Sequence, residues 1–240
     1  MHRKIQRMTE WIYPRRCPLC DGVLGKNEPL LCRACARKLE FAEEPRCFQC
    51  GKPLESTERE YCGDCARGRH RYLEGFAPFV YQGIFKNSVL RFKYSGRPEY
   101  AKFYSAAILR FGGDKIRRWD PEVLIPVPLH RERLLRRGYN QAEVLARQLG
   151  KEAGIPVVSD AVMRKKNTEA QKLLGSRERK KNLEKAFAAG KGIRAFRSAL
   201  IVDDIYTTGS TVDAVAKVLR DSGTEDIYFV SACIAAGGIL

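Results

Sequence analysis

The chain has 240 residues, and its 44 Lys and Arg against 28 Asp and Glu give a formal net charge of +16. Such a surplus favours polyanionic partners, either nucleic acid or phosphate-rich ligands, although a merely solvated basic surface is the simpler alternative. No apolar run approaches the roughly 20 residues that a membrane-spanning helix needs, so we exclude membrane insertion and expect a soluble protein.

Cysteine pairs dominate the N-terminal part of the chain. Eleven residues separate each Cys-x-x-Cys pair from the next, and the eight residues concerned are Cys17, Cys20, Cys32, Cys35, Cys47, Cys50, Cys62 and Cys65. Two such turns supply the four thiolates of a tetrahedral Zn²⁺ site, so the pattern predicts two structural zinc ions. The uniform spacing does not assign the ligands. We favour consecutive pairs, 17/20/32/35 and 47/50/62/65, over an interleaved arrangement.

Two other uses of these cysteines are disulfide bonds and an iron–sulfur cluster. Residues 1–10 are basic and lack the apolar core of a secretory signal, whereas disulfides need an oxidising compartment. We therefore favour zinc and expect a cytoplasmic protein. Cys233 stands alone in an apolar segment and is expected to be a core residue.

Strands and helices are predicted to alternate after the cysteine-rich part, and we place the boundary between residues 1–72 and 73–240. A small cysteine-rich module needs metal to fold, whereas the second part is long enough for its own core. Alternation of this kind is typical of an α/β fold, with a parallel sheet flanked by helices. The predicted strands are 76–81, 123–128, 157–163, 199–205 and 226–235, and the predicted helices are 84–94, 99–111, 141–153, 177–186 and one starting near Val212.

An arginine-rich loop, residues 129–141, joins the predicted strand 123–128 to the helix 141–153. Guanidinium groups suit bidentate recognition of phosphate, and the candidate residues are Arg133, Arg136, Arg137 and Gly138. His130 beside them is expected to be a hydrogen-bonding surface residue rather than an acid. Residues 167–177 are polar and basic; they suit either a mobile flap over a site or a solvated linker.

The most informative stretch is Ala199–Thr211, which reads ALIVDDIYTTGST. A buried strand ends in Asp203 and Asp204, and a helix begins after a turn that contains Thr207, Thr208, Gly209, Ser210 and Thr211. Backbone N–H groups at a helix start favour a phosphate, and small hydroxyl residues add hydrogen-bond donors. The two carboxylates suit ribose hydroxyls, bound directly or through Mg²⁺. The stretch therefore predicts a site for a phosphorylated sugar; an ordinary strand-to-helix turn is the alternative.

This stretch closely resembles the signature for 5-phosphoribosyl-1-pyrophosphate (PRPP) in type I phosphoribosyltransferases. The resemblance implies that Asp203 and Asp204 hold the ribose hydroxyls and that residues 207–211 bind the 5′-phosphate. In such a transfer an acceptor displaces pyrophosphate from C1 of the ribose. The arginine-rich loop then becomes the pyrophosphate-binding loop.

Four Cys-x-x-Cys pairs followed by PVPLHRERLLRRGYNQAEVLA, RKKNTEAQKLLGSRERKKNL and IVDDIYTTGST resemble the ComF family over nearly the whole chain. The family implies a double zinc ribbon fused to a type I phosphoribosyltransferase fold. It also implies a role in natural transformation, in which imported single-stranded DNA is handled together with a helicase-type partner.

Three functional hypotheses follow from this resemblance. The chain is a PRPP- and Mg²⁺-dependent phosphoribosyltransferase with an unidentified acceptor, or it binds single-stranded DNA with PRPP only as a regulator. In the third, the zinc ribbons dock a helicase. Aromatic residues near basic ones are candidate base-stacking positions, although most should belong to the core; they are Tyr61, Tyr72, Phe76 and Phe79.

Overall fold

A five-stranded parallel sheet forms the centre of the protein in the computed structural model, which describes residues 14–68, 70–165 and 185–236. The strands are β1 (Glu74–Phe76), β2 (Phe79–Val80), β3 (Val123–Pro126), β6 (Ser198–Tyr206) and β7 (Asp226–Ile234). Their order is β1-β7-β6-β3, and β2 also pairs with β7. The short strands β1 and β2 therefore form one interrupted edge, where a single strand over residues 76–81 was predicted.

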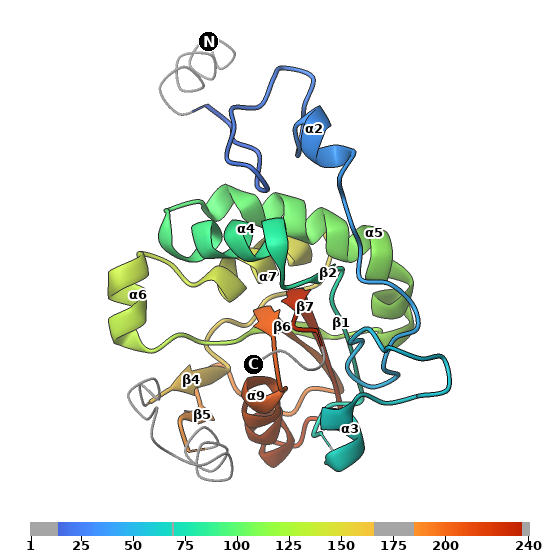
Figure 1. The fold of residues 1–240 in the computed structure, drawn as a ribbon. Helices are drawn as coiled ribbons and strands as arrows, with labels where there is room; N and C mark the ends of the chain where they lie inside the picture. The colour runs from blue at the N-terminus through green and yellow to red at the C-terminus, as the bar shows by residue number, and fades with distance from the viewer. Residues whose placement is uncertain (1–13, 69, 166–184, 237–240) are drawn as a thin grey trace, which may run out of the picture.

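Helices cover both faces of this sheet (Figure 1). On one face lie α4 (Gly83–Tyr94), α5 (Ala101–Trp119) and α7 (Gln141–Ala153), with the short helix η1 (Pro98–Tyr100) before α5. On the other face lies α9 (Ser210–Asp221). The prediction of an α/β fold with a parallel sheet is thus confirmed.

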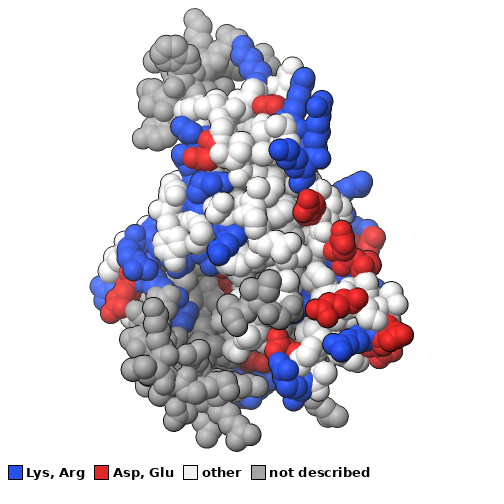
Figure 2. All heavy atoms as spheres, viewed as in Figure 1, with Lys and Arg blue, Asp and Glu red and all other residues white. Residues whose placement is uncertain are grey.

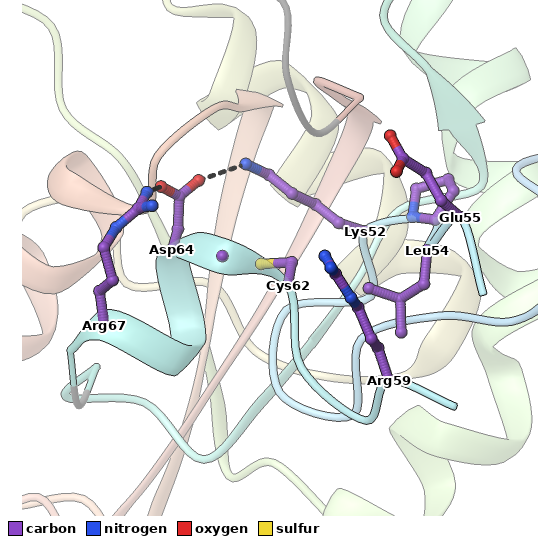
Figure 3. Close-up of a pocket in the computed structure, with 9 residues that line it drawn as sticks. Lys52, Leu54, Glu55, Arg59, Cys62, Asp64 and Arg67 are labelled. Carbon is purple, nitrogen blue, oxygen red and sulfur yellow. Dashed lines mark hydrogen bonds and ion pairs between the residues drawn. The ribbon is translucent and has the colours of Figure 1, made fainter. Parts of the chain in front are cut away.

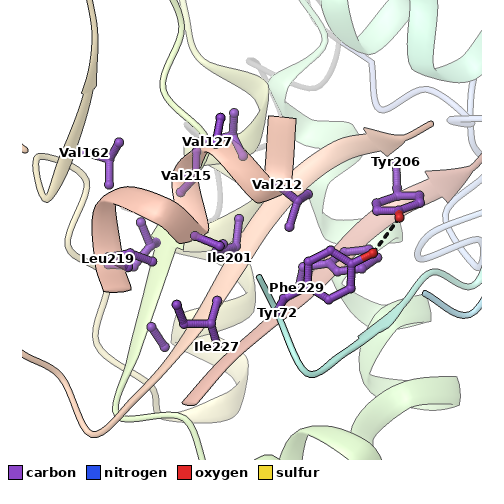
Figure 4. Close-up of a cluster of buried hydrophobic side chains, with 14 of the residues drawn as sticks. Tyr72, Val127, Val162, Ile201, Tyr206, Val212, Val215, Leu219, Ile227 and Phe229 are labelled. Carbon is purple, nitrogen blue, oxygen red and sulfur yellow. Dashed lines mark hydrogen bonds between the residues drawn. The ribbon is translucent and has the colours of Figure 1, made fainter. Parts of the chain in front are cut away.

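Strand β6 is apolar on both sides because it separates two cores. Its side chains alternate between the faces, so Ile201 packs toward α9 whereas Leu200 and Val202 pack with α5 and α7. Helix α9 packs against the Ile201 side of the strand, where its Val212, Val215 and Leu219 point into the shared core (Figure 4).

Two boundaries of α7 follow from local chemistry. The Asn140 side chain accepts a hydrogen bond from the N–H of Ala142 at 3.1 Å, which satisfies a free donor at the helix start. Gly154 ends the helix with φ of +73°, a conformation that glycine adopts without penalty. The predicted helix 141–153 is confirmed at both ends.

The prediction of one continuous strand over residues 157–163 is wrong, because only Val157 and residues 162–163 pair with other strands. Val157 makes a single bridge to Leu124 at the sheet edge, and β4 (Val162–Arg164) turns away to pair antiparallel with β5 (Phe187–Ala189). The arginine-rich segment also differs from a simple loop, because residues Arg131–Arg137 form the short helix α6. The predicted flap at 167–177 lies outside the described residues, and so does nearly all of the predicted helix 177–186.

The cysteine-rich part packs on the sheet layers at two separate places, marked by α2 (Arg33–Ala36) and α3 (Gly63–Arg67) in Figure 1. Near α2, Cys17 and Leu19 share the core of α4 and α5, and the Leu19 carbonyl accepts a hydrogen bond from Arg91 at 2.6 Å. Near α3, the four cysteines of the last two pairs are buried in the core that α9 also lines; they are Cys47, Cys50, Cys62 and Cys65. Cys233 on β7 is fully buried, as predicted.

Candidate functional site

A polar pocket of about 270 Å³ lies at the carboxyl ends of β3 and β6, where ligands bind in parallel α/β sheets. It brings together residues from three segments that the sequence analysis singled out. Those that line it are Asp203, Asp204, Thr207, Thr211, Arg133 and Arg137. Thr208, Gly209 and Ser210 belong to the same turn without lining the pocket, and Arg136 and Gly138 also lie outside its wall.

The acidic pair carries a buried ion pair. Asp204 is only 9% exposed, and its Oδ1 lies 3.0 Å from the Nζ of Lys93 in the last turn of α4. Burial alone would lower the pKa of Lys93, but the Asp204 carboxylate more than offsets this and raises it. The ammonium therefore stays charged and holds one carboxylate of the pair.

Asp203 turns its Oδ1 back to the main chain and accepts a hydrogen bond from the N–H of Asp204 at 2.8 Å. Burial and the neighbouring Asp204 charge raise the pKa of Asp203 to about 7, against the smaller opposing effects of Lys93 and Arg164. One carboxyl of the pair thus titrates near neutral pH while the other is held by an ammonium.

The pKa of Asp203 predicts a pH-dependent stability. Its folded pKa is raised above the unfolded value, so the folded state binds the extra proton and the free energy of unfolding falls as pH rises from about 4 to about 7. We expect this decline between pH 5.5 and 7 in urea titrations of the wild type. In Asp203→Asn the decline should be smaller; equal slopes would contradict the assignment.

The turn at residues 207–211 is the segment that the sequence analysis expects to bind a phosphate. It leads into α9, a helix of 12 residues, and Gly209 caps that helix with φ of +80°. The hydroxyls of Thr208 and Ser210 lie 2.9 Å apart. A Cβ at position 209 would lie 2.5 Å from the Tyr206 Oη, so only glycine fits there. Free N–H groups and hydroxyls at this helix start suit a phosphate.

Two arginines of α6 line the same pocket as the acidic pair. Arg137 donates to Tyr94 Oη at 2.8 Å and to Gln141 Oε1 at 3.0 Å, and its guanidinium lies over the Tyr94 ring at 4.6 Å from the centroid. These contacts hold the group at the pocket wall, where Arg133 lies beside it. Arg131 and Arg136 are exposed, and Figure 2 shows Lys and Arg gathered over α6 on this face.

Five further polar residues of the pocket were not found from the sequence: Tyr81, Lys93, Tyr94, Asn140 and Arg164. Tyr81 follows β2, and Lys93 and Tyr94 end α4, so only the tertiary fold brings them to the end of β6. Asn140 carried a signal that could have been used, because it precedes the predicted helix as a cap residue and also donates to the Val127 carbonyl at 3.0 Å.

The eight paired cysteines form two clusters, in each of which the four Sγ atoms lie within 4.8 Å of one another. The structure groups consecutive pairs, 17/20/32/35 and 47/50/62/65. Cys20 and Cys32 Sγ lie 3.7 Å apart and Cys50 and Cys62 Sγ 3.6 Å apart. A zinc tetrahedron with the usual Zn–S bonds has edges of about 3.8 Å, so both donor sets fit zinc. None of the nine cysteines, all of them described, is in a disulfide.

Among the described residues, no helix combines the length and apolar character needed to cross a bilayer. Of the aromatic residues considered for base stacking, Tyr72, Phe76 and Phe79 are buried in the core. Tyr61 is exposed and packs edge-on against Phe48 on the second cysteine module. The expectation that most of these aromatics belong to the core is confirmed.

Comparison with known families gives two matches. Residues 8–66 match the double zinc ribbon domain, and residues 134–238 match the phosphoribosyl transferase domain. The zinc ribbon match agrees with the two four-cysteine clusters and establishes structural zinc for this part of the chain.

Three curated relatives align with part of this chain. It is 44% identical over 109 residues to Competence protein F of Haemophilus influenzae, which covers 45% of this chain and 48% of the relative. It is 36% identical over 113 residues to DNA utilization protein YhgH of Escherichia coli K12, and this alignment covers 47% of this chain and 49% of the relative. It is 27% identical over 151 residues to Competence protein ComFC of Streptococcus pneumoniae, and this alignment covers 63% of this chain and 64% of the relative. The chain thus spans about half the length of the first two relatives.

Two solved structures are also similar. A purine phosphoribosyltransferase from Pyrococcus horikoshii has a TM-score of 0.33 and 16% identity, covering 57% of this chain and 90% of that chain. An adenine phosphoribosyltransferase has a TM-score of 0.35 and 15% identity, and the match covers 62% of this chain and 84% of that chain.

Proposed function

We propose that this chain, a ComF-family protein of the phosphoribosyltransferase fold with an N-terminal double zinc ribbon, binds PRPP at the β3/β6 pocket and serves in DNA uptake or utilisation. The DNA-related part rests on the printed names of the relatives, Competence protein F, DNA utilization protein YhgH and ComFC. The PRPP part rests on the pocket, and we expect the protein to act in the cytoplasm, where thiolates stay reduced.

One observation carries the PRPP proposal: a single pocket holds an acidic pair, the start of a helix with hydroxyl residues, and two arginines. These three chemistries match ribose hydroxyls, a 5′-phosphate and a pyrophosphate. Thr207 and Thr211 would contact the 5′-phosphate, Asp203 and Asp204 the ribose hydroxyls, and Arg133 and Arg137 the pyrophosphate. Arg136 and Gly138, which lie outside the wall, act in this proposal only by shaping α6 and its end.

The proposed reaction is a transfer of the phosphoribosyl group to an acceptor nucleophile. A bond forms between the acceptor and C1 as the C1–oxygen bond breaks, and pyrophosphate leaves with the bonding electrons. Arginine forks stabilise the charge that develops on the departing oxygens. The carboxylates of Asp203 and Asp204 suit Mg²⁺, which in such sites is held by one or two carboxylates and substrate oxygens and supplies further charge neutralisation.

The proposal predicts that PRPP binds the zinc-loaded protein in a calorimetric titration with Mg²⁺. Because charge-assisted hydrogen bonds to both carboxylates are lost, Asp203→Asn/Asp204→Asn should weaken binding at least about 100-fold. Asp120→Asn is the matched control, since Asp120 pairs with Arg197 on the surface away from the pocket and should leave binding unchanged. Absence of binding to the wild type would overturn the proposal.

A second candidate function is supported by the exposed arginines of α6, Arg131 and Arg136, which lie outside the pocket. In this case the protein holds single-stranded DNA or a helicase-type partner, and PRPP acts only as a regulator. Single-stranded DNA binding with a steep salt dependence that the double Asp variant leaves unchanged, without pyrophosphate release, would favour it over transfer.

A further inference from the structure

The segment that follows the second cysteine cluster runs directly onto the phosphate loop. We call residues 70–73 the strap, and its two ends are fixed to different elements. At one end, the strap is hydrogen bonded to both carboxylate oxygens of Asp213. His70 Nδ1 lies 2.8 Å from Oδ2, and the Arg71 N–H donates to Oδ1 at 2.9 Å. At the other end, the Leu73 N–H donates to the Ile227 carbonyl at 2.8 Å. Asp213 is 2% exposed and lies in the first turn of α9.

Tyr72 fixes the strap to the strand that bears the acidic pair. Its Oη lies 2.6 Å from the Oη of Tyr206, the last residue of β6, and Figure 4 shows the two hydroxyls meeting above Phe229. The His70 ring stacks on the Tyr72 ring with centroids 4.9 Å apart. Tyr72 and Tyr206 are each 1% exposed, so these rings have little room to move.

Two of these rings, those of Tyr206 and His70, lie close to Gly209 of the loop. A Cβ on Gly209 would lie 2.5 Å from Tyr206 Oη and 2.9 Å from His70 Cε1. The Nε2 atom of His70 is buried and has no hydrogen-bond partner among the described residues. The strap therefore sets the position of the Gly209 backbone, where the helix start presents its N–H groups.

The other side of the strap is built on the second cysteine cluster. Gln49, between Cys47 and Cys50, accepts a hydrogen bond from the Gly75 N–H at 2.8 Å and donates to the Tyr72 carbonyl at 3.2 Å. Lys52 follows Cys50, donates to Asp64 at 2.7 Å (Figure 3), and places its ammonium over the Tyr206 ring at 5.8 Å from the centroid. All four cysteines of this cluster belong to the same buried core as Tyr72 and Tyr206.

We propose that metal binding at the second cysteine cluster is energetically coupled to anion binding at residues 207–211, with His70 and Tyr72 as the positioning residues of that loop. The inference rests on the proposed phosphate-binding function of the loop. The metal site organises the turn that holds Gln49 and Lys52, and these hold the strap against α9 and β6. By thermodynamic reciprocity, an anion on the loop must then stabilise the metal in this cluster.

The test uses the full-length zinc-loaded protein and ribose 5-phosphate as the probe. Release of the two zinc ions to a chromogenic chelator is followed with and without ribose 5-phosphate. We expect the release of one zinc ion to slow by about 10-fold at saturating ligand and that of the other to stay within about two-fold. In His70→Ala and Tyr72→Phe this protection should be lost, and His70→Asn, which keeps a donor for Asp213, should restore part of it.

Tyr100→Phe is the matched control for Tyr72→Phe. Tyr100 is fully buried, and its hydroxyl binds Asp21 at 2.5 Å beside the first cysteine cluster, so the same chemical change is made at the other metal site. A second readout does not require ligand: hydrogen exchange at the amides of residues 209–215 should accelerate in His70→Ala and Tyr72→Phe but not in Tyr100→Phe.

The outcomes separate the two proposals. If ribose 5-phosphate fails to bind the wild type while exchange at 209–215 still depends on His70 and Tyr72, the phosphate function fails and the positioning role stands. If ribose 5-phosphate binds but slows neither zinc ion, and exchange in the variants matches that of the wild type, the coupling is overturned.

Discussion

Gly209→Ala is expected to remove anion binding from the phosphate loop almost completely. The backbone φ of +80° disfavours alanine, and the new Cβ would lie 2.5 Å from Tyr206 Oη and 2.9 Å from His70 Cε1. Because these rings are buried and hydrogen bonded, the loop must move instead. A combined strain and misplacement of about 3 kcal/mol corresponds to about a 100-fold weaker affinity for ribose 5-phosphate, measured by calorimetry.

Gly154→Ala separates backbone strain from the local contacts. Gly154 has a similar φ of +73°, but a Cβ there would meet nothing within 4 Å, and it ends α7 away from the pocket wall. This variant should lose about 1 kcal/mol of unfolding free energy and keep its ribose 5-phosphate affinity. If Gly209→Ala binds as tightly as Gly154→Ala, the loop does not hold the phosphate.

Lys93→Met should give the largest loss of stability among the pocket variants. It leaves the Asp204 carboxylate, 9% exposed, without the ammonium 3.0 Å away. Removal of one partner from a buried ion pair lowers the free energy of unfolding by about 3 kcal/mol, which urea denaturation would measure. Binding of PRPP should also weaken, because Asp204 loses the ammonium that holds its carboxylate in place and Asp203 is already neutral in part near pH 7.

A double-mutant cycle tests whether the loss comes from the ion pair. Lys93→Met/Asp204→Asn removes both charges and should be more stable than Lys93→Met alone by about 1 kcal/mol or more. Lys86→Met is the matched control on the exposed side of the same helix and should change stability by no more than about 0.5 kcal/mol. Additive effects in the cycle would show that Lys93 supports the fold without acting through Asp204.

The local parts of the site were predictable from sequence because each lies within one strand–turn–helix segment. The pair Asp203 and Asp204, the turn with Gly209 and the first residues of α9 lie within the 13 consecutive residues 199–211. The consecutive grouping of the cysteines was favoured although their uniform spacing does not assign the ligands, and the structure confirms it.

The missed residues depend on contacts between distant segments. Lys93 lies in a helix whose sequence indicates only an amphipathic surface. The neighbouring residues give no signal that Lys93 pairs with Asp204, which lies more than a hundred residues later in the chain. The incorrect strand at 157–163 has the same cause. Its apolar residues suit a sheet, but only Val157 forms a bridge to β3 at the sheet edge. Strand β4 pairs with β5 instead. His70 was also missed, since its role depends on Asp213.

The edge of the sheet has a consequence for how the protein is made. Strands β1 and β2, which come directly after the cysteine clusters, pair with β7, the last of the described strands. On the ribosome the cysteines emerge first, whereas the surface that buries the second cluster is complete only after Phe229 and Ile234 have been synthesised. Closure of this long-range pairing is therefore a late event. Until then the thiols of Cys47, Cys50, Cys62 and Cys65 are not covered by this core and are accessible to zinc.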